Sequence, residues 1–175
     1  RDLRWFPSYL PERVHMVVSS LPGGVLERLE EKGDWERVVV APLDDQAARR
    51  LFVEYLRQYK KELAEDLVSH VMAHALAANP LFLRTLAEEL RLFGEHERLA
   101  ERLDHYLTSL TVDDLFERVL ERVEEDNGAA PVQQVMVGLW ASRAGLREEE
   151  ILAWADLKPA EWAYIRNALG HALVE

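Results

Sequence analysis

Two histidines stand four residues apart, His70 and His74, in a stretch with helical spacing, so both could face one metal ion from the same side of a helix. The segment reads HVMAH and lacks the glutamate that makes a zinc-protease helix catalytic. No third ligand follows nearby, and the chain contains no cysteine. We therefore interpret both histidines as ordinary helix residues and predict no metal site.

Two short segments carry side chains that could contact a ligand. Ser19 and Ser20 end an apolar, β-branched run, and open α/β sheets bind ligands at the carboxyl ends of their strands. Their hydroxyls could touch a nucleotide phosphate or its attacking water, although a strand that ends in small polar residues explains them equally well. Asn79 and Pro80 form the second segment, whose composition alone indicates only the start of a helix.

The other polar and aromatic clusters are better explained by structure than by chemistry. Between residues 117 and 126, glutamates and arginines recur four apart, which predicts a solvated helix face. The buried stripe of that helix would be Leu115, Val119 and Val123. Tryptophans at helical spacing are most simply core residues, namely Trp140, Trp154 and Trp162.

Catalytic motifs are not recognisable in the sequence. There is no Ser-His-Asp arrangement, nucleophile elbow or glycine-rich dinucleotide loop. Gly23 and Gly24 precede a helix but lack the lysine and the loop length of a phosphate cradle, so they indicate a turn. We predict no catalytic residue.

The first 42 residues have the pattern of an α/β unit. Residues 14–20 (VHMVVSS) and 35–41 (WERVVVA) read as buried strands bounded by proline and glycine. A short helix is predicted between them over 25–32. Strand, helix and strand make one βαβ unit of a parallel sheet, and two strands cannot form a stable sheet alone. The remaining strands are expected upstream of Arg1 or in another chain.

After Pro42 the pattern is helical throughout. One helix is predicted to begin at Asp44 and Asp45, and others over 62–77, 81–93, 95–107 and 111–126, with Pro80 in the first turn of the third. Residues 127–131 (NGAAP) are the clearest linker. Three shorter helices follow over 132–144, 147–155 and 159–173, and three short helices joined by tight turns suggest a helix-turn-helix or winged-helix core.

Composition narrows the possible partners. Acidic residues outnumber basic ones 32 to 21, and the formal net charge is −11 at pH 7. A DNA-binding protein needs a basic face, and no run approaches the roughly 18 apolar residues that span a membrane. We therefore expect neither nucleic acid nor a membrane as partner. The absence of cysteine, of a signal peptide and of an initial methionine leads us to expect a fragment of a cytoplasmic protein.

Several segments together are similar to a known family. Residues 4–11 (RWFPSYLP) and 14–23 (VHMVVSSLPG) resemble a stretch of STAND NTPases with NACHT-type modules, the group found ahead of TPR or WD40 repeats. Residues 78–83 (ANPLFL) look like the GNPLFL segment of that family, and 86–94 continue it in register. Residues 106–124 resemble the helix that leads into the winged helix, and 142–151 resemble the start of that domain. These similarities run in the same order over nearly the whole chain.

The resemblance implies roles for the candidate residues. Ser19 and Ser20 would lie on the sensor strand that reads the γ-phosphate. Pro80 would pack against the adenine base, with Asn79 beside it. The implied cofactor is ATP or ADP with magnesium in the full-length parent, and none is expected for this fragment alone.

The resemblance also implies a domain order and partners. Residues 1–42 would be the C-terminal end of the NTPase α/β core, 43–127 a helical lid, and 131–175 a winged-helix-like domain that stops before its wing. The implied partners are the upstream NTPase core and the downstream repeat domain of the same parent, with a homo-oligomer on activation. In such proteins the winged helix mediates switching and does not read DNA.

The sequence departs from the family at defined places. The G-x-x-x-x-G-K-[ST] loop and the acidic strand that holds magnesium are absent, and the resemblance assigns both to the region upstream of Arg1. Leu21 occupies the position where many relatives carry an arginine, which puts a direct arginine sensor in doubt. Without a phosphate cradle and magnesium the main electrostatic contributions to phosphoryl transfer are missing, so we do not expect this chain to be an enzyme.

The sequence thus predicts a mostly α fold: a remnant of a parallel nucleotide-binding sheet, a helical lid and a winged-helix-like three-helix domain. The predicted function is regulation of an ATP/ADP-switched signalling NTPase, with nucleotide-dependent oligomerisation. The alternative is a helical protein–protein adaptor without a nucleotide role, which would bury Leu3, Trp5 and residues 14–18 in its own core. A winged-helix DNA binder ranks last, because residues 159–173 contain no lysine and only one arginine, Arg166.

Overall fold

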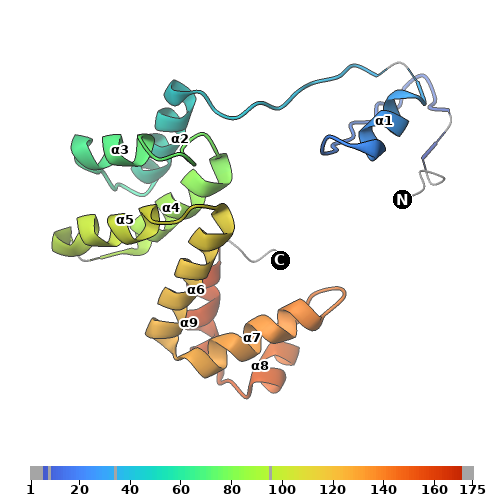
Figure 1. Cartoon of the computed structure of the whole chain (residues 1–175). Helices are drawn as coiled ribbons and strands as arrows, with labels where there is room; N and C mark the ends of the chain where they lie inside the picture. The colour runs from blue at the N-terminus through green and yellow to red at the C-terminus, as the bar shows by residue number, and fades with distance from the viewer. Residues whose placement is uncertain (1–5, 8, 34, 95, 171–175) are drawn as a thin grey trace. The chain divides into compact units, whose positions relative to one another are not determined.

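The computed structural model describes residues 6–170 except 8, 34 and 95. Contacts divide the chain into two compact units, Arg1–Ala41 and Pro42–Glu175. Each unit has its own apolar cluster. All regular structure in the described residues is helical (Figure 1), and no helix among them is both long and apolar enough to cross a membrane.

The first unit holds one short helix, α1 (Gly24–Glu30). Gly23 precedes it with φ of 137°, a conformation that L side chains rarely adopt. Leu29 of α1 and Phe6 are buried, with Met16 and Trp35 packed against them. The rings of Phe6 and Trp35 meet edge to face with their centroids 5.4 Å apart. This small cluster contains all the buried apolar side chains described for the unit.

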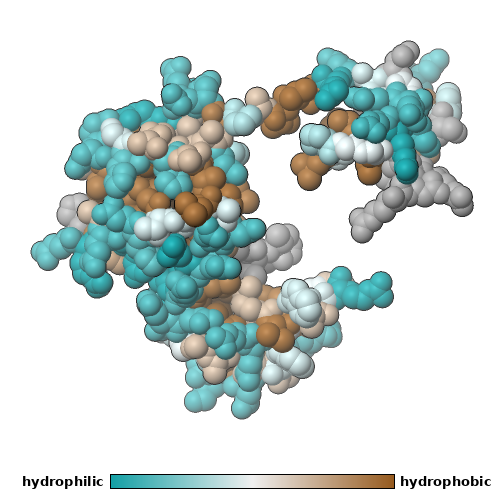
Figure 2. All heavy atoms as spheres, viewed as in Figure 1, coloured by the Kyte–Doolittle hydropathy of each residue, from teal (hydrophilic) through white to brown (hydrophobic). Residues whose placement is uncertain are grey.

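The structure does not show the predicted sheet remnant. Residues 14–20 and the described part of 35–41 form neither helix nor paired strand, and their valines are exposed, whereas Met16 and Trp35 pack on the small cluster. Val17 is 98% exposed and Val40 is 92% exposed. Figure 2 shows the hydrophobic spheres of residues 38–40 along the exposed chain after α1. A strand exists only when a neighbouring strand takes up its N–H and C=O groups, and these segments have none among the described residues.

The second unit is built from α-helices and one 3₁₀ turn. In chain order they are α2 (Asp45–Gln58), α3 (Glu65–Met72), α4 (Pro80–Leu92), η1 (His96–Arg98), α5 (Leu99–Leu107), α6 (Val112–Asn127), α7 (Ala129–Ala141), α8 (Glu148–Ala155) and α9 (Pro159–Leu169). Helix α4 packs against α2, α5 and α6, and α6 also contacts α7 and α9 (Figure 1). One continuous apolar core links these helices from Ala48 to Leu169.

Side-chain caps fix the starts of the main helices. Asp44 accepts a hydrogen bond from the N–H of Ala47 at 2.7 Å and so begins α2. Thr111 and Asp114 form a reciprocal capping box at the start of α6. The predicted stripe of α6 is confirmed, because Leu115, Val119 and Val123 are all buried.

Helices α3 and α5 are shorter than the sequence predicted. α3 covers only Glu65–Met72, and a series of turns follows it instead of further helix. The predicted helix over 95–107 begins with the 3₁₀ turn η1 and becomes regular at Leu99. Both differences lie at helix ends, where turns and 3₁₀ hydrogen bonds often replace the regular ladder.

The predicted linker at residues 127–131 is a single-residue break. Helix α6 ends at Asn127, Gly128 has φ of 89°, and α7 begins at Ala129. Pro131 does not interrupt α7, because the N–H groups of the first helical turn have no partner within the helix. The backbone thus changes direction at one glycine, and the helices on either side are almost continuous in sequence.

Helices α7, α8 and α9 follow in the last part of the unit. α7 contacts α8, and α9 contacts α6 (Figure 1). The three helices agree with the predicted helical segments, but no winged helix is shown, since the described residues include no strand that could form a wing.

The prediction that three tryptophans are core residues was wrong for two of them. Trp162 is 4% exposed, whereas Trp140 is 88% and Trp154 is 58% exposed. The indole N–H of Trp154 donates to the backbone oxygen of Gln134 at 3.0 Å. A Cβ at Gly138 would lie 2.8 Å from the Trp154 ring, so the absence of a side chain at Gly138 lets this indole lie across α7.

Candidate functional site

The first candidate site is the start of α4. The side chain of Asn79 accepts hydrogen bonds from the N–H groups of Leu81 at 2.9 Å and Phe82 at 3.3 Å. Pro80 occupies the first turn, where its missing N–H removes no helical hydrogen bond. Pro80 is exposed and Leu81 is 51% exposed. The segment therefore presents a preorganised apolar surface, which could pack against a flat ring.

The turn before α4 is rigid. The N–H of Asn79 donates to the oxygen of Leu76 at 2.9 Å, and the N–H of Leu76 donates to Nδ1 of His74 at 3.2 Å. The imidazole of His74 also stacks on Phe82, with centroids 4.9 Å apart and an interplanar angle of 8°. His74 thus positions the first turn of α4.

The two histidines of the sequence motif lie on different local structures. His70 lies on α3 with its Nδ1 atom 3.4 Å from the carboxylate of Asp104, while His74 lies in the following turn. Within the described residues no group of three or more histidines and carboxylates could hold a metal ion.

The start of α2 lies beside the start of α4. The N–H of Leu43 donates to the oxygen of Ala78 at 2.9 Å, directly before the Asn79 cap. The Asp44 cap follows Leu43, so two helix N-termini are tied together. Each N-terminus carries a partial positive charge. We name this surface, formed by residues 42–44 and 79–81, the α2–α4 edge.

Ser19 and Ser20 belong to the Arg1–Ala41 unit. Both are exposed on the extended chain before α1, and the hydroxyl of Ser20 donates to the oxygen of Leu21 at 3.0 Å. A hydroxyl used in this way can still accept a hydrogen bond through its lone pairs. Since Asn79 and Pro80 belong to the other unit, the structure describes the two residue pairs separately.

A buried ionic cluster, which sequence reasoning missed, lies further along α4. The Glu89 side chain is 0% exposed and accepts hydrogen bonds from Nε and Nη2 of Arg122 at 2.7 and 3.0 Å. The hydroxyl of Tyr106 donates to the same carboxylate at 2.7 Å. Arg122 reaches Asp126 through Nη1 at 3.1 Å. The cluster joins α4, α5 and α6.

The electrostatics of this cluster follow from its burial. Burial raises the pKa of the Tyr106 hydroxyl well above its usual range, and the neighbouring Glu89 carboxylate raises it further. Burial alone would lower the pKa of Arg122, but the hydrogen bonds to Glu89 and its negative charge raise it above its ordinary value. Arg122 therefore stays charged and Tyr106 stays neutral at physiological pH.

The adjacent residue, Glu88, joins α4 to α2. Its carboxylate accepts hydrogen bonds from the hydroxyl of Tyr55 and, at 2.7 Å, from Nε of Arg91. The Arg91 guanidinium lies 4.4 Å from the ring centroid of Tyr59. Two successive glutamates on α4 thus contact different helices: Glu88 contacts α2, and Glu89 contacts α5 and α6.

Lys61 fixes the other end of α4. Its ammonium donates to the backbone oxygens of Leu90 and, at 2.6 Å, Phe93. Burial lowers the pKa of this lysine. Carbonyl groups at a helix C-terminus have no partner within the helix, so Lys61 acts as a C-terminal cap. Helix α4 is therefore held at both ends and along its length.

A sequence signal for the buried glutamates existed but was weak. Leu83, Leu86, Ala87 and Leu90 share one face of a helical projection; position 89 lies beside Leu86 at the edge of that face, and position 88 lies on the other side of the helix. The same pattern fits an amphipathic helix with two exposed acids. The i,i+4 spacing of Arg118 and Arg122 suggested a solvated face, yet Arg122 is turned inward to Glu89. Only the tertiary partner distinguishes the two arrangements.

Comparison with known proteins found relatives at low identity. The chain is 27% identical over 184 aligned residues to a TPR repeat-containing protein of Dictyostelium discoideum, covering 97% of this chain. It is 30% identical over 154 residues to telomerase protein component 1 of Mus musculus, covering 85% of the chain. It is 25% identical over 158 residues to NACHT and WD repeat domain-containing protein 2 of Homo sapiens, covering 86%.

The chain corresponds to a small part of each relative. It spans 11%, 6% and 9% of their lengths, respectively. No family model and no solved structure matches. The distant similarity to the NACHT and WD repeat protein supports a NACHT-related origin for this chain.

Proposed function

We propose that this chain is the regulatory part of an ATP/ADP-switched signal-transduction NTPase. In this proposal residues 1–42 complete the α/β core of the parent, α2 to α6 form a lid over the nucleotide, and α7 to α9 belong to a winged-helix-like domain. Nucleotide exchange would move these parts relative to each other and expose a surface for homo-oligomerisation, while the parent acts in the cytoplasm. The chain itself would not hydrolyse ATP, because its sequence has no phosphate-binding loop.

The observation that carries the proposal is the exposure of the β-branched segments in the first unit. Val17, Val39 and Val40 are 98%, 72% and 92% exposed on extended chain. Isolated exposed valines are common, but two successive extended runs of them are typical of strands that lack their sheet. This supports a role as edge or inner strands of a sheet completed by other residues of the parent.

The α2–α4 edge supports the nucleotide part of the proposal. Pro80 is exposed at a rigid helix start, and Asn79 holds it there through two backbone hydrogen bonds. In the parent, Pro80 would contact the adenine base, and Ser19 and Ser20 would supply hydroxyls to the γ-phosphate. Magnesium would be held by residues of the parent outside this sequence.

Calorimetry with magnesium-ATP and with ADP tests the proposal. The 175-residue chain would be compared with a longer form that carries about 150 further residues before Arg1, about one typical domain. Binding by the longer form, weakened about three- to tenfold by Pro80→Ala, is expected from loss of the stacked ring. Pro159→Ala is the matched control, since Pro159 is also an exposed proline in the first turn of a helix.

A second function has a specific observation in its favour. Trp140 and Tyr164 are 88% and 70% exposed, and aromatic side chains are enriched where proteins bind other proteins. A helical adaptor without a nucleotide role would use such side chains, and relatives named for TPR and WD repeats are compatible with it. If neither form of the chain binds nucleotide, the switch proposal fails and the adaptor remains.

A further inference from the structure

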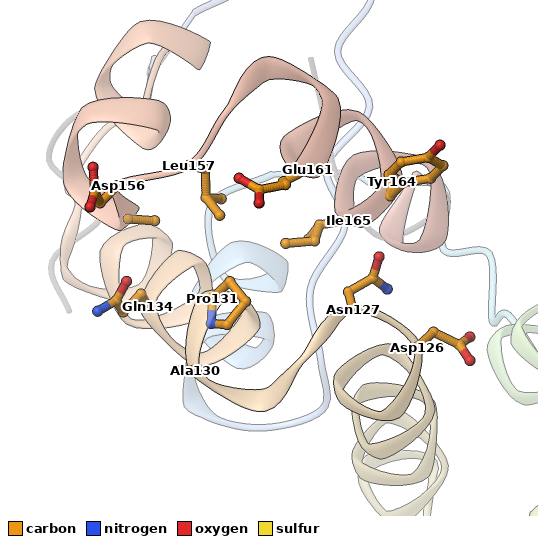
Figure 3. A pocket seen from close by; sticks show the side chains of 11 residues that line it. Asp126, Asn127, Ala130, Pro131, Gln134, Asp156, Leu157, Glu161, Tyr164 and Ile165 are labelled. Carbon is orange, nitrogen blue, oxygen red and sulfur yellow. The ribbon is translucent and has the colours of Figure 1, made fainter.

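A groove lies between the α6–α7 break and the turn from α8 to α9. It has a volume of about 530 Å³, within the range of ligand pockets. Figure 3 shows Asn127, Pro131 and Gln134 along one side, with Leu157, Glu161 and Ile165 opposite them. All of these residues belong to the second unit, so the groove is defined within one compact body.

The floor of the groove is apolar. Pro131, Leu157 and Ile165 line it, and Ile165 is only 1% exposed because it also belongs to the core of the unit. Leu157 packs against the same core. An apolar side chain entering the groove would therefore meet a surface continuous with the protein interior.

The rim of the groove is acidic. Asp126, Asp156 and Glu161 line the groove, and none of the described lining residues is a lysine or an arginine. Asp126 shares the guanidinium of Arg122 with Glu89, so one positive charge faces two negative charges at that end. The groove thus keeps a net negative charge, and a positively charged group would be attracted to it.

Backbone hydrogen bonds hold the Glu161 carboxylate and the turn that carries Asp156. Glu161 accepts a hydrogen bond from the N–H of Lys158 at 2.8 Å. Asp156 has left-handed backbone geometry, with φ of 50°, at the end of α8. The next residue, Leu157, donates its N–H to the oxygen of Leu152 at 3.0 Å. Because the Glu161 carboxylate and the backbone of this turn are already positioned, a ligand would have fewer groups to order, which lowers the cost of binding.

Tyr164 adds an aromatic ring to the rim. It lines the groove from α9 and is 70% exposed. A lysine or arginine of a ligand that interacts with the carboxylates could also lie over this ring, since cations are attracted to aromatic faces.

We infer that this groove binds a basic peptide segment of a partner protein, with one apolar side chain on the floor and lysine or arginine side chains at the rim. Because its floor is apolar, the groove should bind such a peptide more tightly than a simple polycation. Because its rim is acidic, the groove should bind it more tightly than a neutral or acidic peptide. The inference concerns the second unit alone and does not depend on nucleotide binding.

Fluorescence polarisation with a defined probe tests the inference on the whole 175-residue chain. The probe is a fluorescein-labelled peptide of alternating leucine and arginine, compared with the same peptide carrying glutamine or glutamate in place of arginine. The groove variant combines Asp126→Asn, Asp156→Asn and Glu161→Gln. Each change removes charge but keeps an oxygen that can accept the existing hydrogen bonds, and asparagine tolerates left-handed geometry.

The expected result is that the groove variant binds the arginine probe about tenfold more weakly, the combined effect of several exposed charge pairs. Tyr164→Ala, at an exposed position, should weaken binding about threefold through loss of the cation–π contact. The control variant combines Glu117→Gln, Glu121→Gln and Glu149→Gln, exposed carboxylates outside the groove with the same total charge change.

Three outcomes would overturn the inference. An equal loss in the control variant would show that the probe responds only to the overall charge of −11. Competition by spermidine as strong as that by unlabelled probe would show that the apolar floor has no role. Equal binding of the glutamate peptide would exclude recognition of basic segments. Thermal unfolding followed by circular dichroism checks that every variant remains folded.

Discussion

The two units differ in how far their apolar side chains are buried. In Pro42–Glu175 the buried apolar side chains of α2 to α9 form one core, and α4 is held by buried glutamates and capped ends. In Arg1–Ala41 the described buried cluster consists of Phe6 and Leu29 with two partly buried neighbours. The valines of its extended segments remain in solvent. The difference shows that a helix forms its backbone hydrogen bonds with residues nearby in the sequence, whereas a strand needs a partner strand that can be far away in the sequence.

The largest expected contrast between the units comes from truncating one apolar side chain in each. Phe82 is 0% exposed and Val17 is 98% exposed. Phe82→Ala should lower the free energy of unfolding by about 3–5 kcal/mol, because it leaves a cavity and loses the stacking on His74. Val17→Ala should change it by less than about 0.5 kcal/mol.

Urea unfolding followed by helical circular dichroism measures both changes. A destabilisation of similar size in both variants would mean that Val17 is covered in solution. In that case the contrast between the two units would disappear, together with the main support for the incomplete sheet.

The second contrast concerns buried and exposed ion pairs. Arg122→Met leaves Glu89 buried with only the Tyr106 hydroxyl as partner, and should destabilise the chain by about 3 kcal/mol. Arg50→Met removes an exposed i,i+4 pair with Glu54 at 3.0 Å and should cost less than about 0.5 kcal/mol.

Combining Arg122→Met with Glu89→Met shows how much of the lost stability comes from the unpaired charge of Glu89. The double variant should recover much of the lost stability, since it removes the unpaired carboxylate and keeps apolar volume. A double variant that is less stable than Arg122→Met alone would indicate that the ion pair itself, and not the unpaired charge, dominates the energetics of α4 and α6.

A smaller effect is expected at the start of α4. Asn79→Ala leaves two N–H groups without their cap and should lower the free energy of unfolding by about 1 kcal/mol. Asn79→Asp keeps a side-chain acceptor, so at about neutral pH it should change the free energy of unfolding by only about 0.3 kcal/mol. Chemical denaturation of both variants measures the difference. If Asn79→Ala were neutral, the helix start would be fixed by the preceding turn and not by the Asn79 side chain.

The smallest effect is a pH dependence. The hydrogen bond with the Thr111 side chain, followed by those from the N–H groups of Leu110 and Thr111, lowers the pKa of the Asp114 carboxyl below its ordinary value. A lowered pKa in the folded state stabilises the chain above the unfolded-state pKa, about 4, and this contribution is lost as the pH falls through the folded-state pKa.

Asp114→Asn should therefore destabilise the chain near pH 7 and make less difference below about pH 4. Denaturation at both pH values compares it with Asp113→Asn, an exposed neighbour outside the capping box. If the difference in free energy of unfolding between Asp114→Asn and the original chain stayed constant with pH, the negative charge of Asp114 would not contribute to stability.

Much of the helical part could be predicted from the sequence, because helix signals are local. Asp44, Asn79 and Thr111 each mark a helix start, and all three act as caps in the structure. The periodic stripe of α6 is likewise buried as predicted. Helix formation depends mainly on neighbours three or four residues away, and those neighbours are visible in the sequence.

Features that depend on distant partners could not be predicted in the same way. The valine runs favour strands, but pairing requires residues far along the chain. Trp140 has the spacing of a core residue and is exposed, while Glu89 has the chemistry of a surface residue and is buried. For the candidate site, the sequence indicated that a helix starts at Asn79 and Pro80, with Pro80 in its first turn. It did not reveal the hydrogen bond that ties them to the start of α2.

Gly128 sets the direction in which α7 leaves α6. It alone separates α6 from α7, and α7 has 13 residues, so its length is about 20 Å at a rise of about 1.5 Å per residue. A rotation of about 20° at this glycine would displace the far end of α7 by about 7 Å. The contacts of α7 with α6 and α8 hold it in its present direction. The largest displacement from a change at Gly128 would occur at the end of α7 that carries the exposed Trp140.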